Sequence, residues 1–181
     1  ESLSNSWTAI QELSKDPTSS VNQTLFVTRA HEFTTRASAV YTSLCQYQDN
    51  LNQSIVKEVN NINKYAEEIE LLNQKIMSVE AGGIEHANDL RDRRNLLLDK
   101  LAQLGNISCK EDASGYVTVR FENVNIVQGG LVNKMELYTD PQTGFYTPYW
   151  KMLANGSYDE KGKMVVTEED IQSALVYDLS K

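Results

Sequence analysis

The sequence predicts an α+β protein: an elongated helical bundle built on one very long helix, followed by a smaller β-rich domain. Through residues 19–79 apolar residues recur at steps of three and four, and no proline or glycine interrupts them. This spacing places them on one stripe of a helix. After Gly105 the period changes to two, which is typical of strands. We therefore expect a helical domain over residues 1–106 and a β-rich domain with a short terminal helix over residues 107–181.

The long helix would extend about 90 Å at about 1.5 Å per residue. Globular helices are usually much shorter, so this length is typical of a bundle, a coiled coil or a fibre subunit. From Ile55 to Ile76 the spacing is heptad-like, with the polar Asn73 at one core position. A bundle helix is favoured over a free-standing coiled-coil dimer. The weakest segment is residues 34–36, where β-branched threonines lower helix propensity and a break would give two collinear helices.

A short first helix precedes the long one, with its apolar positions at Leu3, Trp7, Ile10 and Leu13. The Asp16-Pro17 pair ends it, because a proline disfavours the helical conformation of the residue before it. The hydroxyl side chains that follow can cap the next helix. We expect the first helix to fold back on the beginning of the long one.

A third helix is predicted over residues 89–104, after Gly82-Gly83 has ended the long helix and Asn88 has provided a cap. Its leucines form an apolar face made of Leu90, Leu97, Leu101 and Leu104, with Leu98 alongside. We expect Leu97 and Leu101 to pack against the end of the long helix, at Ile69, Leu72 and Ile76.

The first half of the third helix carries a dense set of charges: Asp89, Arg91, Asp92, Arg93 and Arg94. Two interpretations are open. These side chains can form a solvated face with local ion pairs, or Arg91, Asp92, Arg93 and Arg94 can form a polar contact between subunits.

Strands are predicted over residues 107–111, 116–121, 123–127, 131–139 and 145–152, with turns at residues 112–115, 129–130, 140–144 and 155–156. Residues 167–170 are expected to begin a short helix with an acidic first turn, continuing through Ile171 and Val176. The aromatic cluster of Tyr146, Tyr149 and Trp150 is typical of a sheet core or edge. A carbohydrate or partner platform is the alternative.

Composition argues against several functions. The net charge of −8 makes nucleic-acid binding unfavourable, because that affinity comes mostly from neutralising phosphates. No run of 18 apolar residues is present, so no membrane span is expected. His31 and His86 are the only histidines and no catalytic or ligand-spaced motif occurs, so we expect no enzymatic activity, no cofactor and no metal. Cys45 and Cys109 are expected to be free thiols.

The helix lengths leave one part of the long helix without a partner. A first helix of about 18 Å and a third helix of about 24 Å can reach only the two ends of a rod of about 90 Å. The middle nevertheless carries apolar residues on the helical stripe: Val40, Tyr41, Leu44, Tyr47, Leu51 and Ile55. An uncovered apolar stripe of this size is typical of an interaction surface. Leu44, Leu51 and Ile55 are therefore candidate subunit contacts.

Two motifs in this order resemble the family of flagellar hook-associated protein 1. Residues 7–18, WTAIQELSKDPT, are similar to the short helix and Asp-Pro turn that precede the long helix in that family. Residues 88–101, NDLRDRRNLLLDKL, are similar to its signature after the long helix, although Asn95 stands where an acidic residue is usual. The β-rich half resembles the family only in its position and in Val127-Gln128-Gly129.

The resemblance implies a structural subunit, exported through the flagellar type III apparatus, that joins hook to filament as an extracellular adaptor ring. The implied partners are the hook protein, the second hook–filament junction protein and copies of the same subunit. Family members have terminal helices that pair with each other and bind the export chaperone. We expect this chain to be the middle of such a protein, with the C-terminal return lying on the uncovered stripe. The alternatives are another long-helix secretion substrate, such as a needle-tip protein, and a secreted surface enzyme or carbohydrate-binding domain using the cluster of Tyr146, Tyr149 and Trp150.

Overall fold

The computed structural model describes residues 1–82 and 86–176. The chain divides into two compact units, Glu1–Leu51 and the residues from Asn52 onward. The helices are α1 (Ser2–Lys15), α2 (Ser20–Glu80), α3 (Asn88–Ala102) and α4 (Glu168–Ile171). The strands are β1 (Ile107–Glu111), β2 (Val117–Phe121), β3 (Val124–Gln128), β4 (Leu131–Val132), β5 (Met135–Thr139), β6 (Tyr146–Trp150), β7 (Ser157–Tyr158) and β8 (Met164–Val165). Short 3₁₀ turns cover Lys151–Leu153 and Gln172–Ala174.

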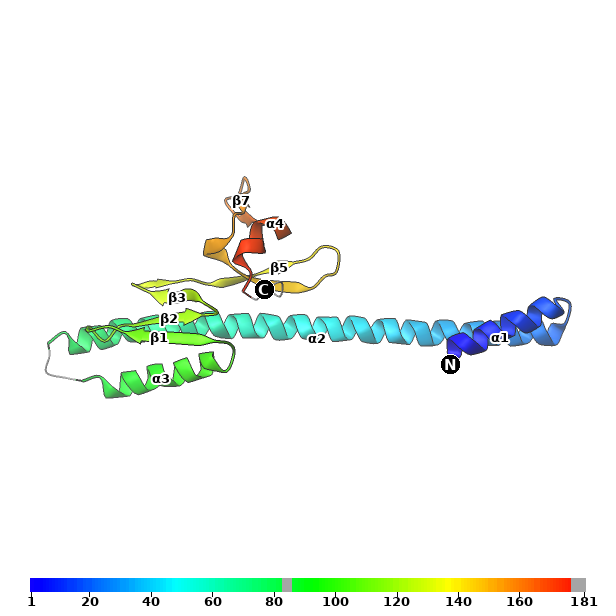
Figure 1. Cartoon of the computed structure of the whole chain (residues 1–181), viewed down its shortest axis with the longest axis horizontal. Coiled ribbons are helices and arrows are strands. Elements are labelled where there is room, and N and C mark those ends of the chain that lie inside the picture. Colours follow the sequence, from blue (N-terminus) through cyan, green and yellow to red (C-terminus); the bar gives the residue numbers. More distant parts are fainter. Residues whose placement is uncertain (83–85, 177–181) are drawn as a thin grey trace. The chain divides into compact units, whose positions relative to one another are not determined.

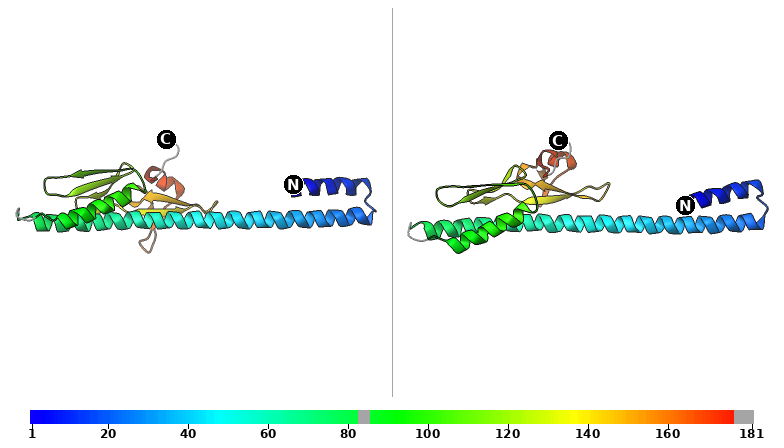
Figure 2. Two further views of the ribbon diagram at one scale, coloured as in Figure 1. Left: turned by 90° about the horizontal axis from the view of Figure 1, so that it is seen from below. Right: turned by 60° about the horizontal axis from the view of Figure 1, so that its bottom comes forward.

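In the first unit α1 reverses onto the first turns of α2, as Figure 2 shows from two sides. The Ser6 hydroxyl donates to the carbonyl of Arg29 at 3.0 Å. The Asn22 amide donates to the carbonyl of Glu12 at 3.1 Å, and Ser19 Oγ caps α2 by accepting from the Asn22 N–H. The predicted hairpin is confirmed. Helix α2 also runs through residues 34–36 without a break.

The face of α1 that packs on α2 is not the predicted apolar stripe. The buried residues of α1 are Ser6 and Ala9, whereas Leu3 is 66% and Trp7 is 61% exposed. Small side chains at the contact let the two backbones approach closely enough for the Ser6 hydroxyl to reach a carbonyl of α2. Sequence periodicity alone cannot separate this close-packed face from the larger residues beside it.

In the second unit α3 lies alongside the last turns of α2, with β1–β3 over the pair (Figure 1). Leu97 and Leu101 are buried in one hydrophobic cluster with Ile69 and Leu72, which confirms that part of the predicted packing. Ile76 is fully buried but lies outside that cluster.

The N-terminus of α3 is built differently from the prediction. Asn88 is the first helical residue, Ala87 occupies the cap position, and no side chain caps the helix, so the predicted Asn88 cap is wrong. Instead, the Glu80 carboxylate on α2 accepts the Ala87 N–H at 2.9 Å. The predicted end of α2 at Gly82-Gly83 falls partly outside the described residues, because Gly83 is not among them; α2 ends at Glu80.

The strands form three antiparallel sheets, β1-β2-β3-β4, β5-β6 and β7-β8. The strand predicted over residues 131–139 is therefore wrong: β4 closes the first sheet and β5 begins the second. The break lies at Asn133, whose N–H donates to the carbonyl of Ile126 on β3 before the chain leaves that sheet. Thr167 and Asp170 form a reciprocal capping box at the start of α4, as the acidic turn predicted.

A single hydrophobic cluster joins the second part of α2, α3 and the first two sheets. It contains Val59 and Ile62 from α2 together with Val119, Phe121 and Trp150 from the strands. The structure thus places residues 52–106 in the same compact unit as the strands, whereas the predicted boundary at residue 106 follows the change in periodicity. Within the described residues, no helix has the combined length and apolar character needed to cross a membrane.

Candidate functional site

The candidate contact surface is a run of apolar side chains on the first unit's part of α2. Four of its residues are more than half exposed: Val40 at 60%, Tyr41 at 71%, Leu44 at 62% and Tyr47 at 63%. Leu51 is 37% exposed. We call these five residues the α2 stripe. Solvent-exposed apolar residues at helical spacing over three turns form a surface suited to a second helix.

Ile55, the third candidate contact from the sequence, does not belong to the α2 stripe. It is half-buried and packs against the hydrophobic cluster of the second unit. From Val59 onward the same helical spacing is buried within the unit, through Val59, Ile62, Ala66, Ile69, Leu72 and Ile76. The exposed part of this apolar stripe is therefore limited to the segment before Asn52.

Three asparagines of α2 attach the strands to the helix. The Asn73 side chain donates to the carbonyl of Val117 at 2.9 Å and accepts its N–H at 3.2 Å. Asn63 binds Met135 in the same two-way manner, at 2.9 Å for each bond. An asparagine amide used in this way replaces the hydrogen bonds of a neighbouring strand.

Asn52 repeats the arrangement at the β5–β6 turn. Its side chain donates to the carbonyl of Gly144 at 2.8 Å and accepts the N–H of Tyr146 at 3.1 Å. The three asparagines thus fix β2, β5 and the start of β6 against one helix. Sequence reasoning noted Asn73 as a polar core position but missed Asn52 and Asn63, whose spacing of 10–11 residues along α2 was the only available signal.

A buried arginine adds a second connection between helices and strands. Arg94 is 2% exposed and donates from Nη1 to Asn73 Oδ1 at 3.0 Å and to the carbonyl of Gly115 at 2.6 Å. Its Nη2 also reaches Glu111 at 3.2 Å. The interpretation of Arg94 as a surface or subunit contact is therefore wrong. Its guanidinium is buried and pairs with Glu111 and the carbonyl of Gly115 in the β1–β2 hairpin.

Arg91, one turn away, bridges the end of α2 to β1. It forms ion pairs with Glu80 at 2.6 Å and with Glu111 at 2.5 Å, and its side chain is only 27% exposed. The hydrogen bond from Arg91, helped by the N–H of Ala87, lowers the pKa of Glu80 to about 2. The two carboxylates in turn raise the pKa of Arg91. Arg91 and Glu80 thus neutralise each other within the second unit.

The hairpin turn at Gly115 fits tightly over these arginines. Gly115 has a φ of +81°, and a Cβ built there would lie 2.8 Å from Nη2 of Arg91. A side chain at this position would meet both backbone strain and a collision. Asp92 and Arg93, by contrast, are exposed, and a nitrogen of Arg93 lies 4.0 Å from the Glu68 carboxylate.

The aromatic cluster is not a binding platform. Tyr149 is 3% and Trp150 is 1% exposed, and Tyr146 is half-buried. Burial and a hydrogen bond to Glu136 raise the pKa of Tyr149 to about 12. The rings of Tyr149 and Trp150 pack in hydrophobic clusters of the second unit, with Trp150 edge-on to Phe121 at a centroid distance of 6.4 Å. Among the described residues, no group of three or more His, Cys, Asp or Glu side chains could hold a metal ion.

Residues 1–172 match the family model of the flagellar hook-associated protein FlgK helical domain. The chain belongs to this family. The matched region includes most of the strand-rich half, for which the sequence motifs gave little support. The FlgK resemblance proposed from the two motifs is thereby confirmed, and the family is one of structural components of the bacterial flagellum.

Two known proteins extend the comparison. Flagellar hook-associated protein 1 of Bacillus subtilis (strain 168) is 27% identical over 113 residues, which are 62% of this chain and 22% of that protein. The solved structure of the flagellar hook junction protein FlgK from Burkholderia pseudomallei aligns with a TM-score of 0.73 over 97% of this chain and 31% of that chain, at 20% identity. This second likeness shows the fold. The chain spans less than a third of the length of either relative.

Proposed function

We propose that this chain is the part of a hook-associated subunit that packs side by side with other helices where the hook joins the filament. The observation that supports this proposal most directly is the α2 stripe, in which four of five apolar side chains are more than half exposed. Membership of the FlgK helical-domain family supports the location on the flagellum. The role is mechanical: many weak apolar contacts along one helix add up to a strong lateral attachment.

The proposal extends to partners and place. The subunit acts outside the cell, and its neighbours are the hook protein, the second hook–filament junction protein and further copies of itself. A helix of the parent subunit or of a neighbour covers the α2 stripe in the assembled junction. No enzymatic role is proposed.

The proposal is tested in cells that carry the parent gene with Leu44→Asp and Leu51→Asp. A charged carboxylate on the stripe must be desolvated when a second helix packs there, so hooks should form but fail to carry filaments. Leu71→Asp is the matched control, because Leu71 is a 55% exposed leucine of the same helix that does not belong to the α2 stripe. Electron microscopy of isolated hooks gives the fraction with filaments. Normal filaments in the double variant would overturn the proposal.

A further inference from the structure

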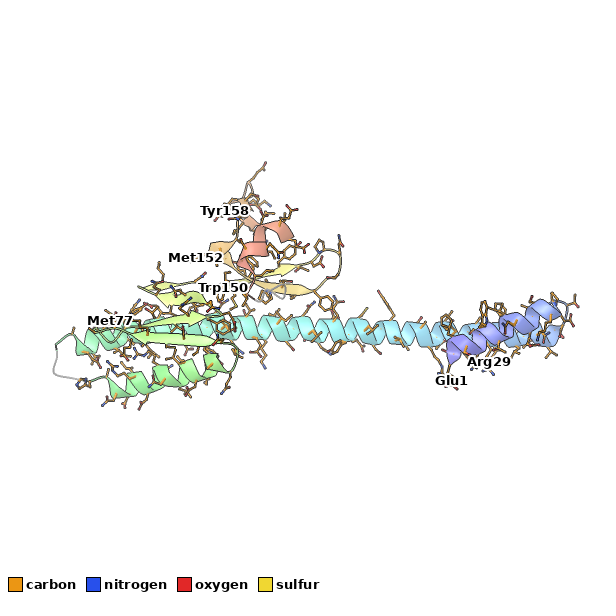
Figure 3. The ribbon with its side chains drawn as sticks, in the orientation of Figure 1. Glu1, Arg29, Met77, Trp150, Met152 and Tyr158 are labelled. Carbon is orange, nitrogen blue, oxygen red and sulfur yellow. The ribbon has the colours of Figure 1, made fainter. Side chains whose placement is uncertain are left out.

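A pocket of about 480 Å³ lies beside the last turns of α2, where the β1–β2 turn and the Gly129-Gly130 turn approach the helix. Glu70, Gln74 and Met77 line it from α2, and Asp112, Tyr116 and Gly130 line it from the two turns. Met77 is labelled at this end of α2 in Figure 3. All of these residues belong to the second unit and none is on the α2 stripe.

Glu70 is the unusual member of this pocket because it is only 5% exposed. Its Oε2 accepts from the Tyr116 hydroxyl at 2.5 Å, and its Oε1 accepts from Nε2 of Gln74 at 3.0 Å. The Tyr116 oxygen itself accepts from the N–H of Gly130 at 3.1 Å. A carboxylate has about four lone-pair sites, so each oxygen keeps capacity for another donor.

Among the residues that the structure describes, Glu70 has no ion-pair partner. Within the described ranges, no Lys or Arg nitrogen lies within 4.0 Å of its carboxylate, and the ion pairs of α2 involve other glutamates. The pocket is lined by a second carboxylate, Asp112, and by no basic residue. Asp112 accepts from the N–H groups of Ser114 and Tyr116, so it stabilises the turn and adds negative potential. A buried carboxylate without a cation is costly, and a cation entering this pocket would offset that cost.

We propose that this pocket is a binding site for an arginine side chain of a neighbouring protein, with Glu70 as the group that receives the guanidinium. A planar guanidinium suits the site better than an ammonium, because it donates in a fixed fork and packs on aromatic and thioether surfaces such as those of Tyr116 and Met77. Met77 is 39% exposed and so is available for such packing. The chain already holds one guanidinium this way: Arg94 is bound by an amide, a carbonyl and a carboxylate.

The test uses the whole chain, labelled with ¹⁵N, and titrates it with Nα-acetyl-arginine amide or with the uncharged Nα-acetyl-citrulline amide. The arginine probe should shift the amide signals of Gly129, Gly130 and Tyr116 in a saturable way. Citrulline should bind about tenfold more weakly, since it keeps the shape but lacks the charge-assisted hydrogen bonds. Equal binding of the two probes, or no shift at these amides, would overturn the proposal.

Two variants separate this site from general attraction to an acidic protein. Glu70→Gln keeps an oxygen acceptor while removing the charge, and should weaken binding of the arginine probe about tenfold. Glu67→Gln removes the same charge from the exposed side of α2 and should leave the binding unchanged; its side chain is 48% exposed. An equal loss of affinity for the arginine probe in both variants would count against the proposal. A saturable shift of the same amide signals by MgCl₂ alone would also count against it. Neither result would bear on the α2 stripe.

Discussion

Asn73 is the most demanding of the three asparagines that attach strands to α2. It is completely buried, and its side chain forms two hydrogen bonds with the backbone of Val117 and a third with Arg94. We expect Asn73→Ala to lower the free energy of unfolding by about 2–4 kcal/mol, because it leaves buried backbone groups and an arginine nitrogen unsatisfied.

Urea unfolding followed by circular dichroism measures this loss. Asn60→Ala is the matched control, since Asn60 is an exposed asparagine of the same helix and its replacement should change stability by less than about 0.5 kcal/mol. If both variants lose the same amount, the hydrogen bonds of Asn73 do not hold β2 to α2.

The lowered pKa of Glu80 predicts that the stability of the fold depends on pH. Its folded-state pKa of about 2 lies below the ordinary value of 4.5, so its ion pair with Arg91 stabilises the fold at pH values above 4.5. That contribution should disappear as the pH falls from about 4.5 to about 2. Melting temperatures of the native chain and of Glu80→Gln should therefore differ at pH 6 and converge near pH 2. Glu160→Gln, which changes an exposed glutamate, should show no such difference; curves for Glu80→Gln that stay parallel to the native chain would contradict the assignment.

Arg94 is the buried charged residue that sequence reasoning placed wrongly. Arg94 looked like a surface charge because charged residues are seldom buried without partners. Two of its partners, Glu111 and Gly115, lie 17–21 residues later in the chain, and the third, Asn73, lies 21 residues earlier on α2. Tyr149 and Trp150 were correctly favoured as sheet residues, although both are buried as neighbours on β6, which strand alternation alone does not predict. The burial of a charged side chain depends on tertiary partners that periodicity cannot reveal.

At the scale of elements, the contact between α3 and α2 carries the next prediction. Leu97 is 4% exposed within the main hydrophobic cluster. Leu97→Ala should cost about 2–5 kcal/mol through lost burial and the cavity that remains. Leu96→Ala on the same helix, where the side chain is 54% exposed, is the control and should cost less than about 0.5 kcal/mol. Denaturant melts of the two variants decide the matter, and indistinguishable midpoints would show that Leu97 does not pack there.

Long periodic elements were predictable, whereas the short hairpin of β7 and β8 and the division between β4 and β5 were not. The helical spacing located α1, α2 and α3 to within a few residues, and alternation located β1, β2 and β3. The hairpin of β7 and β8 has two residues in each strand, too few to show any alternation. The division between β4 and β5 was also missed, because it depends on backbone bonds of Asn133 and on the capture of Met135 by Asn63 rather than on a change in composition.

At the scale of the whole molecule, the two units differ in what they offer to other proteins. The second unit buries its apolar helix positions within its own core. The first unit leaves the five residues of the α2 stripe exposed to different degrees. This contrast was predictable from helix lengths alone, because α1 and α3 are too short to cover the middle of α2. It supports the proposal that residues 40–51 pack against a further helix in the assembled junction.

The most direct measurement is the rate at which a thiol at position 44 reacts with a maleimide, in the parent protein with Cys45→Ser, Cys109→Ser and Leu44→Cys. Leu44 is 62% exposed in the isolated chain, so labelling there should be rapid. In purified hook–filament junctions the same thiol should be protected at least about tenfold, because a packed helix excludes the reagent. Protection at position 44 that exceeds that of Leu71→Cys is the predicted result. Labelling of position 44 at the same rate before and after assembly would contradict the account.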